Sequence, residues 1–327
     1  MFKIEKEKYT MFLSIILIIV GFILLILGAD MLVDGASGVA KKFHIPEIII
    51  GLTIVSIGTS MPELFVSITS AIDGYSDMAI GNVVGSNLCN LLLILGLASI
   101  LRPVKFQKET IKYEIPMCLI FTIILMIFAS TGSTISKIEA ICLLILFTLF
   151  IFYTIFMGKK QSLNNPLVEL EKEDKKQSNI VKNIIFIILG ILGLKIGGDL
   201  AVNNAVNIAK IVGLSEKIIS LTILAIGTSL PELVTSVVAA LKGDSDIAIG
   251  NIIGSNIFNI LLILGVSAII KPIAYNMSYN FDLILLVVST IILAIFPYIP
   301  PKKEMSRLNG VLYCIMYASY IGMLFMK

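Results

Sequence analysis

Long apolar stretches separated by short polar ones dominate the chain. An α-helix needs about 20 mainly apolar residues to cross the bilayer core, and ten stretches reach roughly that length. They cover residues 10–40, 47–73, 78–100, 112–130, 136–157, 180–209, 216–242, 247–269, 281–297 and 307–326. Strands of a membrane barrel would instead alternate apolar and polar positions over about 10 residues. The pattern therefore predicts an all-α integral membrane protein with ten transmembrane helices.

Composition supports this prediction and excludes several functions. Of the 327 residues, 57% are hydrophobic and 14% are charged, whereas a soluble domain carries about 25% charged residues. The first apolar stretch is too long for a signal peptide and lacks a clear cleavage site. The sequence contains no nucleotide-binding loop and no nucleophile–base pair that would indicate an enzyme. It also contains no basic stripe that would indicate a nucleic-acid partner. We expect contact with the lipid bilayer and no obligate protein partner.

Cysteine and histidine give no sign of a resident metal. The four cysteines lie in apolar stretches without CxxC spacing, and the single histidine, His44, lies in a loop beside Pro46. Cysteines in such positions usually act as small packing residues. We therefore expect no zinc site, no disulfide and no cofactor.

One longer polar stretch, residues 159–179, divides the chain. It contains the mixed-charge sequence ELEKEDKK, and stretches of this kind are usually solvated. We expect a short linker between two five-helix halves, residues 1–158 and 180–327.

The two halves repeat each other. The string LTIVSIGTSMPE, which begins at Leu52, returns as LTILAIGTSLPE at Leu221, an offset of 169 residues. Aligned at this offset without a gap, residues 28–103 and 197–272 are identical at about half of their positions. The repeat therefore covers a large part of each half.

The number of helices between the copies predicts their relative orientation. The offset spans five predicted helices, and because five is odd the second copy must cross the membrane in the opposite direction. Secondary transporters use such inverted repeats, with broken helices, to build a binding site near the bilayer midplane. We expect residues 47–100 and 216–269 to form that site.

Loop charges predict which side each loop faces. With the N-terminus outside the cell, we count 16 lysines and arginines in cytoplasmic loops and 8 in external loops. Because cytoplasmic loops carry the excess of positive charge, an extracellular N-terminus and a cytoplasmic linker are predicted for a multi-pass protein of the cell membrane.

The first helix of each half is unusually long. About 30 helical residues span about 45 Å, more than the roughly 30 Å of the bilayer core, so these helices must tilt or protrude. Asp30 and Asp199 occupy matching positions within them, and Lys195 lies one turn before Asp199. We expect Lys195 and Asp199 to form an ion pair rather than to take part in transport.

A glutamate stands inside each copy of the repeated string. Glu63 and Glu232 lie in otherwise apolar, membrane-length stretches. One charged side chain at the bilayer centre costs about 2.5–3.5 kcal/mol on insertion scales. Two of them, at matching positions of an inverted repeat, predict a shared intramembrane cation site.

The residues before each glutamate predict a broken helix. Pro62 removes a backbone hydrogen bond and Gly58 loosens the helix, so a break is expected near Ile57–Ser60. Freed carbonyls, hydroxyls and a carboxylate are the oxygen ligands that hard cations such as Ca²⁺ prefer. In a soluble protein the same T-S-x-P-E sequence is an ordinary helix start with a hydroxyl cap, and capping can coexist with ligation.

The spacing of the polar residues places them on common helix faces. Residues four apart share a face, which groups Thr59 with Glu63 and Ser67, Thr228 with Glu232 and Ser236, Asn82 with Ser86 and Asn90, and Asn251 with Ser255 and Asn259. The glycine pairs Gly81/Gly85 and Gly250/Gly254 allow close helix packing. Some of these amides are expected only to join helices, above all Asn82, Asn87, Asn251 and Asn256.

The charge of the predicted site favours exchange. Two carboxylates among neutral oxygens balance one divalent cation, several monovalent cations or two protons. A site that accepts one of these sets at a time is typical of an antiporter. A proton-coupled antiporter of Ca²⁺ or another divalent cation stays an alternative, and a cation channel is a further one that the inverted repeat disfavours.

At these residues the chain resembles the sodium/calcium exchangers of the cation/calcium antiporter superfamily. The resemblance rests on GTSMPE with GNVVGSNLCN and on GTSLPE with GNIIGSNIFN. It extends to the ten helices, the inverted halves and the short linker, which is typical of the prokaryotic branch. It implies exchange of Na⁺ for Ca²⁺ by alternating access, commonly three Na⁺ for one Ca²⁺, with the first and sixth helices sliding as a gate.

The resemblance also implies four ion sites arranged as a diamond. Glu63 and Glu232 would be the shared calcium ligands, with the carbonyls of Thr59 and Thr228 completing that site, Ser60, Ser86, Ser229, Ser255 and the carbonyls of Ser56 and Ala225 forming outer sodium sites, and Asn90 and Asn259 flanking the middle. Many sodium/calcium exchangers carry aspartate at the position of Asn259. The neutral pair leaves the middle site and the stoichiometry open. It makes potassium coupling less expected, because potassium-dependent relatives tend to use acids there.

Overall fold

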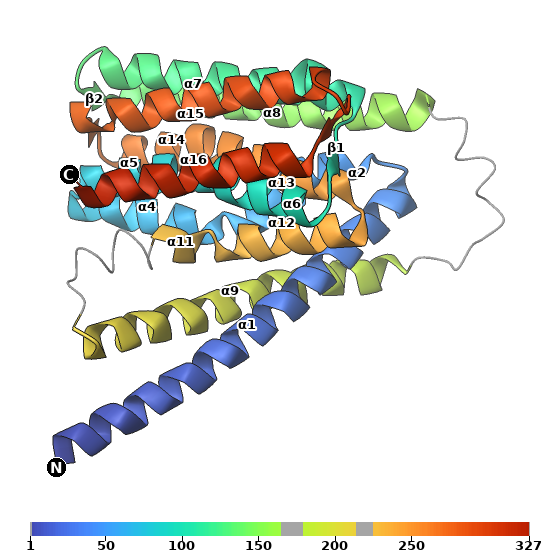
Figure 1. Ribbon diagram of the computed structural model, residues 1–327. Coiled ribbons are helices and arrows are strands. Elements are labelled where there is room, and N and C mark those ends of the chain that lie inside the picture. Colours follow the sequence, from blue (N-terminus) through green and yellow to red (C-terminus); the bar gives the residue numbers. More distant parts are fainter. Residues whose placement is uncertain (1, 165–178, 214–224, 327) are drawn as a thin grey trace.

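The computed structural model describes residues 2–164, 179–213 and 225–326, and most of them are helical (Figure 1). The first half contains α1 (Phe2–Phe43), α2 (Glu47–Ile50), η1 (Gly51–Val55), α3 (Ser56–Thr59), α4 (Met61–Asp73), α5 (Ser76–Leu88), η2 (Cys89–Ile94), α6 (Leu95–Leu101), β1 (Val104–Lys105), η3 (Thr110–Glu114), α7 (Ile115–Ser130), β2 (Thr134–Ile135) and α8 (Lys137–Asn164). The second half contains α9 (Ile180–Ile211), α11 (Ala225–Thr228), α12 (Leu230–Lys242), α13 (Ser245–Phe258), η6 (Asn259–Ile263), α14 (Leu264–Ile270), β3 (Ile273–Ala274), η7 (Met277–Tyr279), α15 (Asn280–Ile295), η8 (Phe296–Tyr298), β4 (Glu304–Met305) and α16 (Arg307–Met326).

Among the described residues, helix covers the ten predicted stretches apart from Ser60, Ser136 and Ser229. Residues 216–224 of the seventh stretch and residues 165–178 of the predicted linker lie outside the described residues. Among the described helices, seven are long and apolar enough to cross a membrane, or eight if the bent pair Glu47–Thr59 and Met61–Asp73 forms one span. The chain is therefore a multi-pass, mainly helical membrane protein.

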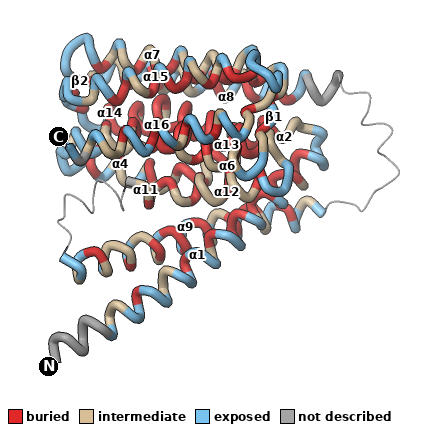
Figure 2. The backbone as a smooth tube through the Cα atoms, in the orientation of Figure 1, coloured by how far each residue is buried: buried red, intermediate tan, exposed pale blue. Residues whose placement is uncertain are grey.

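The core lies around the two helices that follow the broken ones. The apolar, membrane-length stretch of α13–α14 is 83% buried, compared with 22% for the stretches of α1 and of α8. Figure 2 shows the same contrast, with buried residues gathered along α5, α6, α13 and α14 and exposed ones on the outer helices. The exposed apolar side chains of the outer helices suit contact with lipid.

The long helices α1 and α9 pack against each other through glycines, beside the rest of the bundle (Figure 1). A Cβ atom at Gly28 would lie 2.7 Å from the backbone nitrogen of Leu194, and one at Gly197 would lie 2.7 Å from the carbonyl oxygen of Gly21. Only glycine permits backbones to approach this closely. Both halves thus contribute matching glycines, because Gly28 and Gly197 are related by the repeat.

Two small antiparallel ribbons join the halves at opposite ends of the bundle (Figure 1). Strand β1 pairs with β4, with Val104 opposite Met305. Strand β2 pairs with β3, with Ile135 opposite Ile273. Each ribbon takes one strand from each half, so loops far apart in the sequence are held together at each end.

The ion pair predicted between Lys195 and Asp199 is wrong. In the described structure Lys195 lies over the ring of Phe65, 5.8 Å from its centroid, and the ion pairs found are those of Lys242 with Asp30 and a neighbouring aspartate. A lysine one turn before an acid opposes the helix dipole, so this order is the weaker one for a pair within a helix.

Candidate functional site

The repeated string builds a broken helix, as predicted. In the first half a π turn, Gly51–Val55, precedes α3, and the chain then turns at Ser60 and restarts as α4. The axes on either side differ by 50°. Ser229 adopts nearly the same backbone angles before α12, with φ −89° and ψ 8° against −84° and 8° at Ser60. Each glutamate therefore lies in the first turn of a helix, where the dipole favours negative charge.

The serines of the two strings bond to the opposite glutamates. Ser60 and Ser229 occupy the N-cap positions of α4 and α12, but neither hydroxyl caps its own helix. The Ser60 hydroxyl donates to Glu232 Oε1 at 2.9 Å, and the Ser229 hydroxyl donates to Glu63 Oε1 at 3.2 Å. The string is thus a helix start whose usual capping group reaches across to the other half.

Both glutamates are fully buried, with one carboxylate oxygen each left without a protein partner. Glu63 and Glu232 are 0% exposed, and Oε2 of each has no hydrogen-bond partner among the described residues. Neither forms an ion pair with any described lysine, arginine or histidine. An uncompensated buried charge is expensive, so this pair of carboxylates needs cations or protons.

Two buried amide oxygens have the same property. In the described part of the chain, Oδ1 of Asn90 and Oδ1 of Asn259 lack a hydrogen-bond partner, and both residues are buried at matching positions of the repeat. Asn90 is the second residue of the π turn Cys89–Ile94, and Asn259 is the first residue of the π turn Asn259–Ile263. Such turns are frequent at functional sites. Together with the glutamates they supply four buried acceptor oxygens from four helices.

The remaining predicted ligands lie close by, but not all in the same way. The Ser86 hydroxyl donates to Glu63 Oε1 at 3.5 Å, whereas the matching hydroxyl of Ser255 is buried without a partner. The Thr59 hydroxyl donates to Asn251 Oδ1 at 2.9 Å, so this side chain links the two halves. Thr228 is partly buried one residue before Ser229.

Ser56 and Ala225 are the one predicted pair that the repeat does not keep identical. Ser56 is fully buried, and its hydroxyl donates to the carbonyl of Thr53 at 3.2 Å. It lies against Gly254, where an added Cβ would come within 2.7 Å of the Ser56 hydroxyl. Ala225 begins α11, next to residues outside the description.

Asn82 and Asn251 join neighbouring helices, as predicted. Each donates to a serine hydroxyl at 2.9 Å, Asn82 to Ser67 and Asn251 to Ser236. Each also donates to the carbonyl of the glutamate in its own half, at 3.2 Å and 3.4 Å. These bonds hold the first turn of α4 and of α12 against the following helix.

Sequence reasoning missed one buried hydroxyl of the site and did not show that one predicted pair of helix-joining amides would bond across the halves. The hydroxyl of Thr235 on α12 is buried without a hydrogen-bond partner, and the repeat gave no signal for it because the matching residue is Val66. Asn87 and Asn256 bond across the halves. Their presence in both copies was the available signal.

The chemistry of the site is that of hard-cation binding by oxygen. The described residues contain no group of three or more histidine, cysteine, aspartate or glutamate side chains placed to hold a metal. The donors are two carboxylates, amide oxygens and hydroxyls, a set that suits Ca²⁺ or Na⁺ and not zinc or copper.

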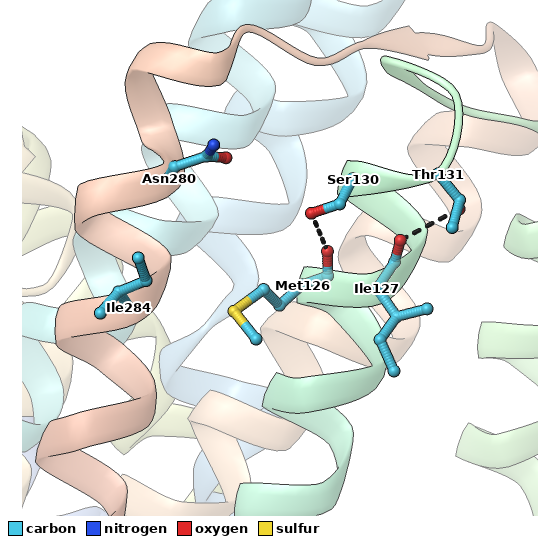
Figure 3. A pocket seen from close by; sticks show the side chains of 6 residues that line it. All are labelled: Met126, Ile127, Ser130, Thr131, Asn280 and Ile284. Atoms are coloured by element: carbon cyan, nitrogen blue, oxygen red, sulfur yellow. Dashed lines mark hydrogen bonds between the residues drawn. The ribbon is translucent and has the colours of Figure 1, made fainter.

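A pocket between α7 and α15 does not belong to this site (Figure 3). It has a volume of about 320 Å³ and is lined by Met126, Ile127, Ser130, Thr131, Asn280 and Ile284, none of them a predicted ligand. The hydroxyls of Ser130 and Thr131 donate to carbonyls of their own helix. The pocket is therefore mainly apolar and offers no carboxylate.

Comparison with known proteins matches both halves to one family. The family model described as sodium/calcium exchanger protein matches residues 13–156 and again residues 182–326. A protein of Alkalimonas amylolytica named putative antiporter CaxA is 38% identical over 314 residues, which cover 95% of this chain and 98% of that protein. The sodium/calcium exchanger MaX1 of Methanosarcina acetivorans is 32% identical over 349 residues, covering 95% and 98%.

A solved structure has the same fold. The sodium-calcium exchanger NCX_Mj, soaked with 2.5 mM Na⁺ and 0.1 mM Ca²⁺, aligns with a TM-score of 0.82 and 31% sequence identity. The alignment covers 95% of this chain and 98% of that chain. The likeness therefore extends over both halves and is accompanied by sequence similarity.

Proposed function

This chain belongs to the sodium/calcium exchanger family, and we propose that it exchanges Na⁺ for Ca²⁺ across the membrane by alternating access. Family membership supports antiport of a cation against Ca²⁺. The coupling to Na⁺ is the further step that we propose. The observation that carries the proposal is the pair of buried, cross-bonded glutamates, Glu63 and Glu232, each with a carboxylate oxygen that no described group satisfies.

The charge of the pair explains why exchange is favoured over simple passage. When the site is empty, two carboxylates face each other in a buried region, and moving them across the membrane barrier in that form is costly. One Ca²⁺ balances both charges, and so does a set of Na⁺ ions. The carrier therefore changes conformation only when one set or the other is bound, which couples the two fluxes.

We assign the ion ligands as follows. Glu63 and Glu232, with the carbonyls of Thr59 and Thr228, would hold Ca²⁺. The outer sodium sites would use Ser60, Ser86, Ser229 and Ser255 with the carbonyls of Ser56 and Ala225, and Asn90 and Asn259 would flank the middle. Supporting this assignment, the hydroxyls of the serines at 60, 86 and 229 lie within hydrogen-bond distance of glutamate oxygens, so a cation bound beside a glutamate would also be near a serine oxygen.

The proposed architecture is ten transmembrane helices in two inverted halves, with α1 and α9 as the moving pair. The ribbons support inversion, because β1–β4 and β2–β3 exchange the roles of the halves at opposite ends. The close glycine contacts between α1 and α9 hold these two helices together, which supports their moving as one pair. We place the N-terminus outside the cell, since the β1–β4 end carries Arg102, Lys105 and Lys303 and cytoplasmic loops carry the excess of positive charge.

Flux measurements in proteoliposomes test the proposal. Ca²⁺ uptake is measured with an outward gradient of Na⁺, K⁺ or H⁺ imposed separately, with ionophores to clamp the membrane potential. We expect only the Na⁺ gradient to drive uptake. Uptake driven by a pH gradient alone would replace Na⁺ by H⁺ as the coupled ion, and single-channel currents without any counter-ion would replace the carrier by a channel.

A further inference from the structure

Four asparagines form a closed hydrogen-bonded network across the two halves. We propose that Asn87 and Asn256 are positioning residues that fix the amides of Asn259 and Asn90 with their oxygens toward the ion site. We further propose that this network requires a hydrogen-bond donor at position 259 and so keeps the middle of the site neutral. The inference rests on the proposed function of the site as a cation site.

Chemistry alone determines how Asn87 and Asn256 point. The Asn87 Nδ2 donates to the backbone oxygen of Asn256 at 3.2 Å, and the Asn256 Nδ2 donates to the backbone oxygen of Asn87 at 3.3 Å. A carbonyl oxygen only accepts, so the amide atom beside it must be the nitrogen. Both side chains are 0% exposed, so turning either amide around would press two acceptors together without water to separate them.

This orientation dictates that of the next pair. Because the Nδ2 atoms of Asn87 and Asn256 bond to backbone oxygens, their Oδ1 atoms are left to accept. Oδ1 of Asn87 accepts from Asn259 Nδ2 at 2.9 Å, and Oδ1 of Asn256 accepts from Asn90 Nδ2 at 3.0 Å. A donor is needed at both places. The amide nitrogens of Asn90 and Asn259 are therefore held inside the network, and their oxygens are the atoms left over.

Helical spacing puts Asn90 and Asn259 on the same helix faces as two serines of the site. Asn90 follows Ser86 by one helical turn, on the same face, and the Ser86 hydroxyl donates to Glu63 Oε1. Asn259 follows Ser255 in the same way, and the Ser255 hydroxyl is also buried without a partner. A cation gains from an amide oxygen and is repelled by an amide NH₂, so the flip state of these two amides determines cation affinity.

The same network explains the neutral residue at position 259. An ionised aspartate there would set a carboxylate oxygen against Oδ1 of Asn87, in place of the present 2.9 Å donor–acceptor pair. Two buried acceptors in contact are unfavourable. Asn87 therefore selects an amide at position 259, and the site charge stays at that of Glu63 and Glu232.

Equilibrium binding of radioactive Ca²⁺ to the purified, detergent-solubilised chain tests the network without any counter-ion. We expect Asn87→Ala to weaken Ca²⁺ binding by about 10–100-fold, the usual effect of losing a residue that orients a metal ligand. In an Asn259→Ala background the same change should cause no further loss. Asn256→Ala, acting through Asn90, is an independent second arm, and Thr122→Val is the control, since that buried hydroxyl bonds only within its own helix.

Introducing a carboxylate at position 259 gives a second test, because Asn87→Ala should then strengthen Ca²⁺ binding instead of weakening it. Asn259→Asp alone should weaken Ca²⁺ binding at pH 8, and adding Asn87→Ala should restore it, because the opposing acceptor is gone. A residue that merely stabilises the fold would make the double variant worse.

The outcomes separate the two proposals. Wild-type protein that binds Ca²⁺ but shows no Na⁺-driven uptake overturns the proposed function alone. Asn87→Ala and Asn256→Ala variants that bind Ca²⁺ like Thr122→Val overturn the positioning role alone. Wild-type protein that binds no Ca²⁺ overturns both.

Discussion

The two halves carry the same glutamates and neighbouring serines but bond them differently. Glu63 Oε1 accepts from two serines, Ser229 at 3.2 Å and Ser86 at 3.5 Å. Glu232 Oε1 accepts from Ser60 at the shorter distance of 2.9 Å, and the hydroxyl that would match Ser86 has no partner. The difference comes from how the helices are arranged, because the serines and glutamates are identical in the two copies.

Under the proposed function, this asymmetry is what an inverted-repeat carrier needs. If both halves had the same conformation, the site would be equally related to both sides of the membrane. A carrier that opens to one side at a time must hold its halves in different conformations and exchange them during transport. Matched variants in the two halves can therefore separate what depends on the shared chemistry from what depends on the conformation.

The largest effect is expected from neutralising either glutamate. Glu63→Gln and Glu232→Gln should each reduce Ca²⁺ uptake by more than about 100-fold, since one carboxylate cannot balance a divalent cation in a buried site. The loss should be equal in the two halves because the charge is shared. Uptake in proteoliposomes is the measurement, with Glu139→Gln as control, because that glutamate caps its own helix at Ser136. Wild-type uptake in one of the two variants would contradict a shared site.

The next effect concerns the glycine contact between α1 and α9. Gly28→Val and its repeat mate Gly197→Val would each push a side chain against backbone at 2.7 Å. Overpacking of this kind costs about 1–3 kcal/mol, and we expect exchange to fall about tenfold or more in both variants. Gly322→Val is the matched control, since an added Cβ there meets no described atom within 4 Å. Unchanged exchange would show that the pair does not move as proposed.

A smaller and unequal effect should follow from removing the cross-half hydroxyls. Hydrogen bonds to charged groups contribute about 1.5–3 kcal/mol, so Ser60→Ala should change the apparent Ca²⁺ affinity by about tenfold. Ser229→Ala should change it less, because its bond to Glu63 is longer. Equal shifts in the two variants would mean that the observed asymmetry has no energetic consequence. The concentration dependence of uptake gives both values.

The smallest effect is expected at an ion pair that only one half possesses. Lys242 bonds to Asp30 and Asp34 at 2.6 Å each, and the matching residue in the first half is Asp73. The partners are partly exposed, so the pairs contribute about 1 kcal/mol or less. Lys242→Gln should alter the uptake rate by about threefold, and raising the ionic strength with an inert salt should produce the same change in the wild type. A tenfold change would assign this pair a larger role.

Sequence patterns predicted the features that depend on neighbouring residues. The break at Ser60 follows from Gly58 and Pro62, because proline cannot continue the hydrogen-bond ladder. The burial of Glu63 and Glu232 follows from their place in apolar, membrane-length stretches. The count of helices between the copies predicted inversion, and that prediction stays a proposal.

Only the tertiary structure could show which groups meet across the halves. The partners of Ser60, Asn87 and Lys242 are 172, 169 and 212 residues away, and no local pattern encodes such pairs. Lys195 illustrates the limit, since proximity in sequence suggested Asp199 while packing placed it over Phe65. Sequence by itself determined that two carboxylates must be buried in a duplicated, broken helix, because burial and helix breaking are local and costly. Which oxygens remain free for a cation was decided by the fold, because hydrogen bonds between distant residues consume the others.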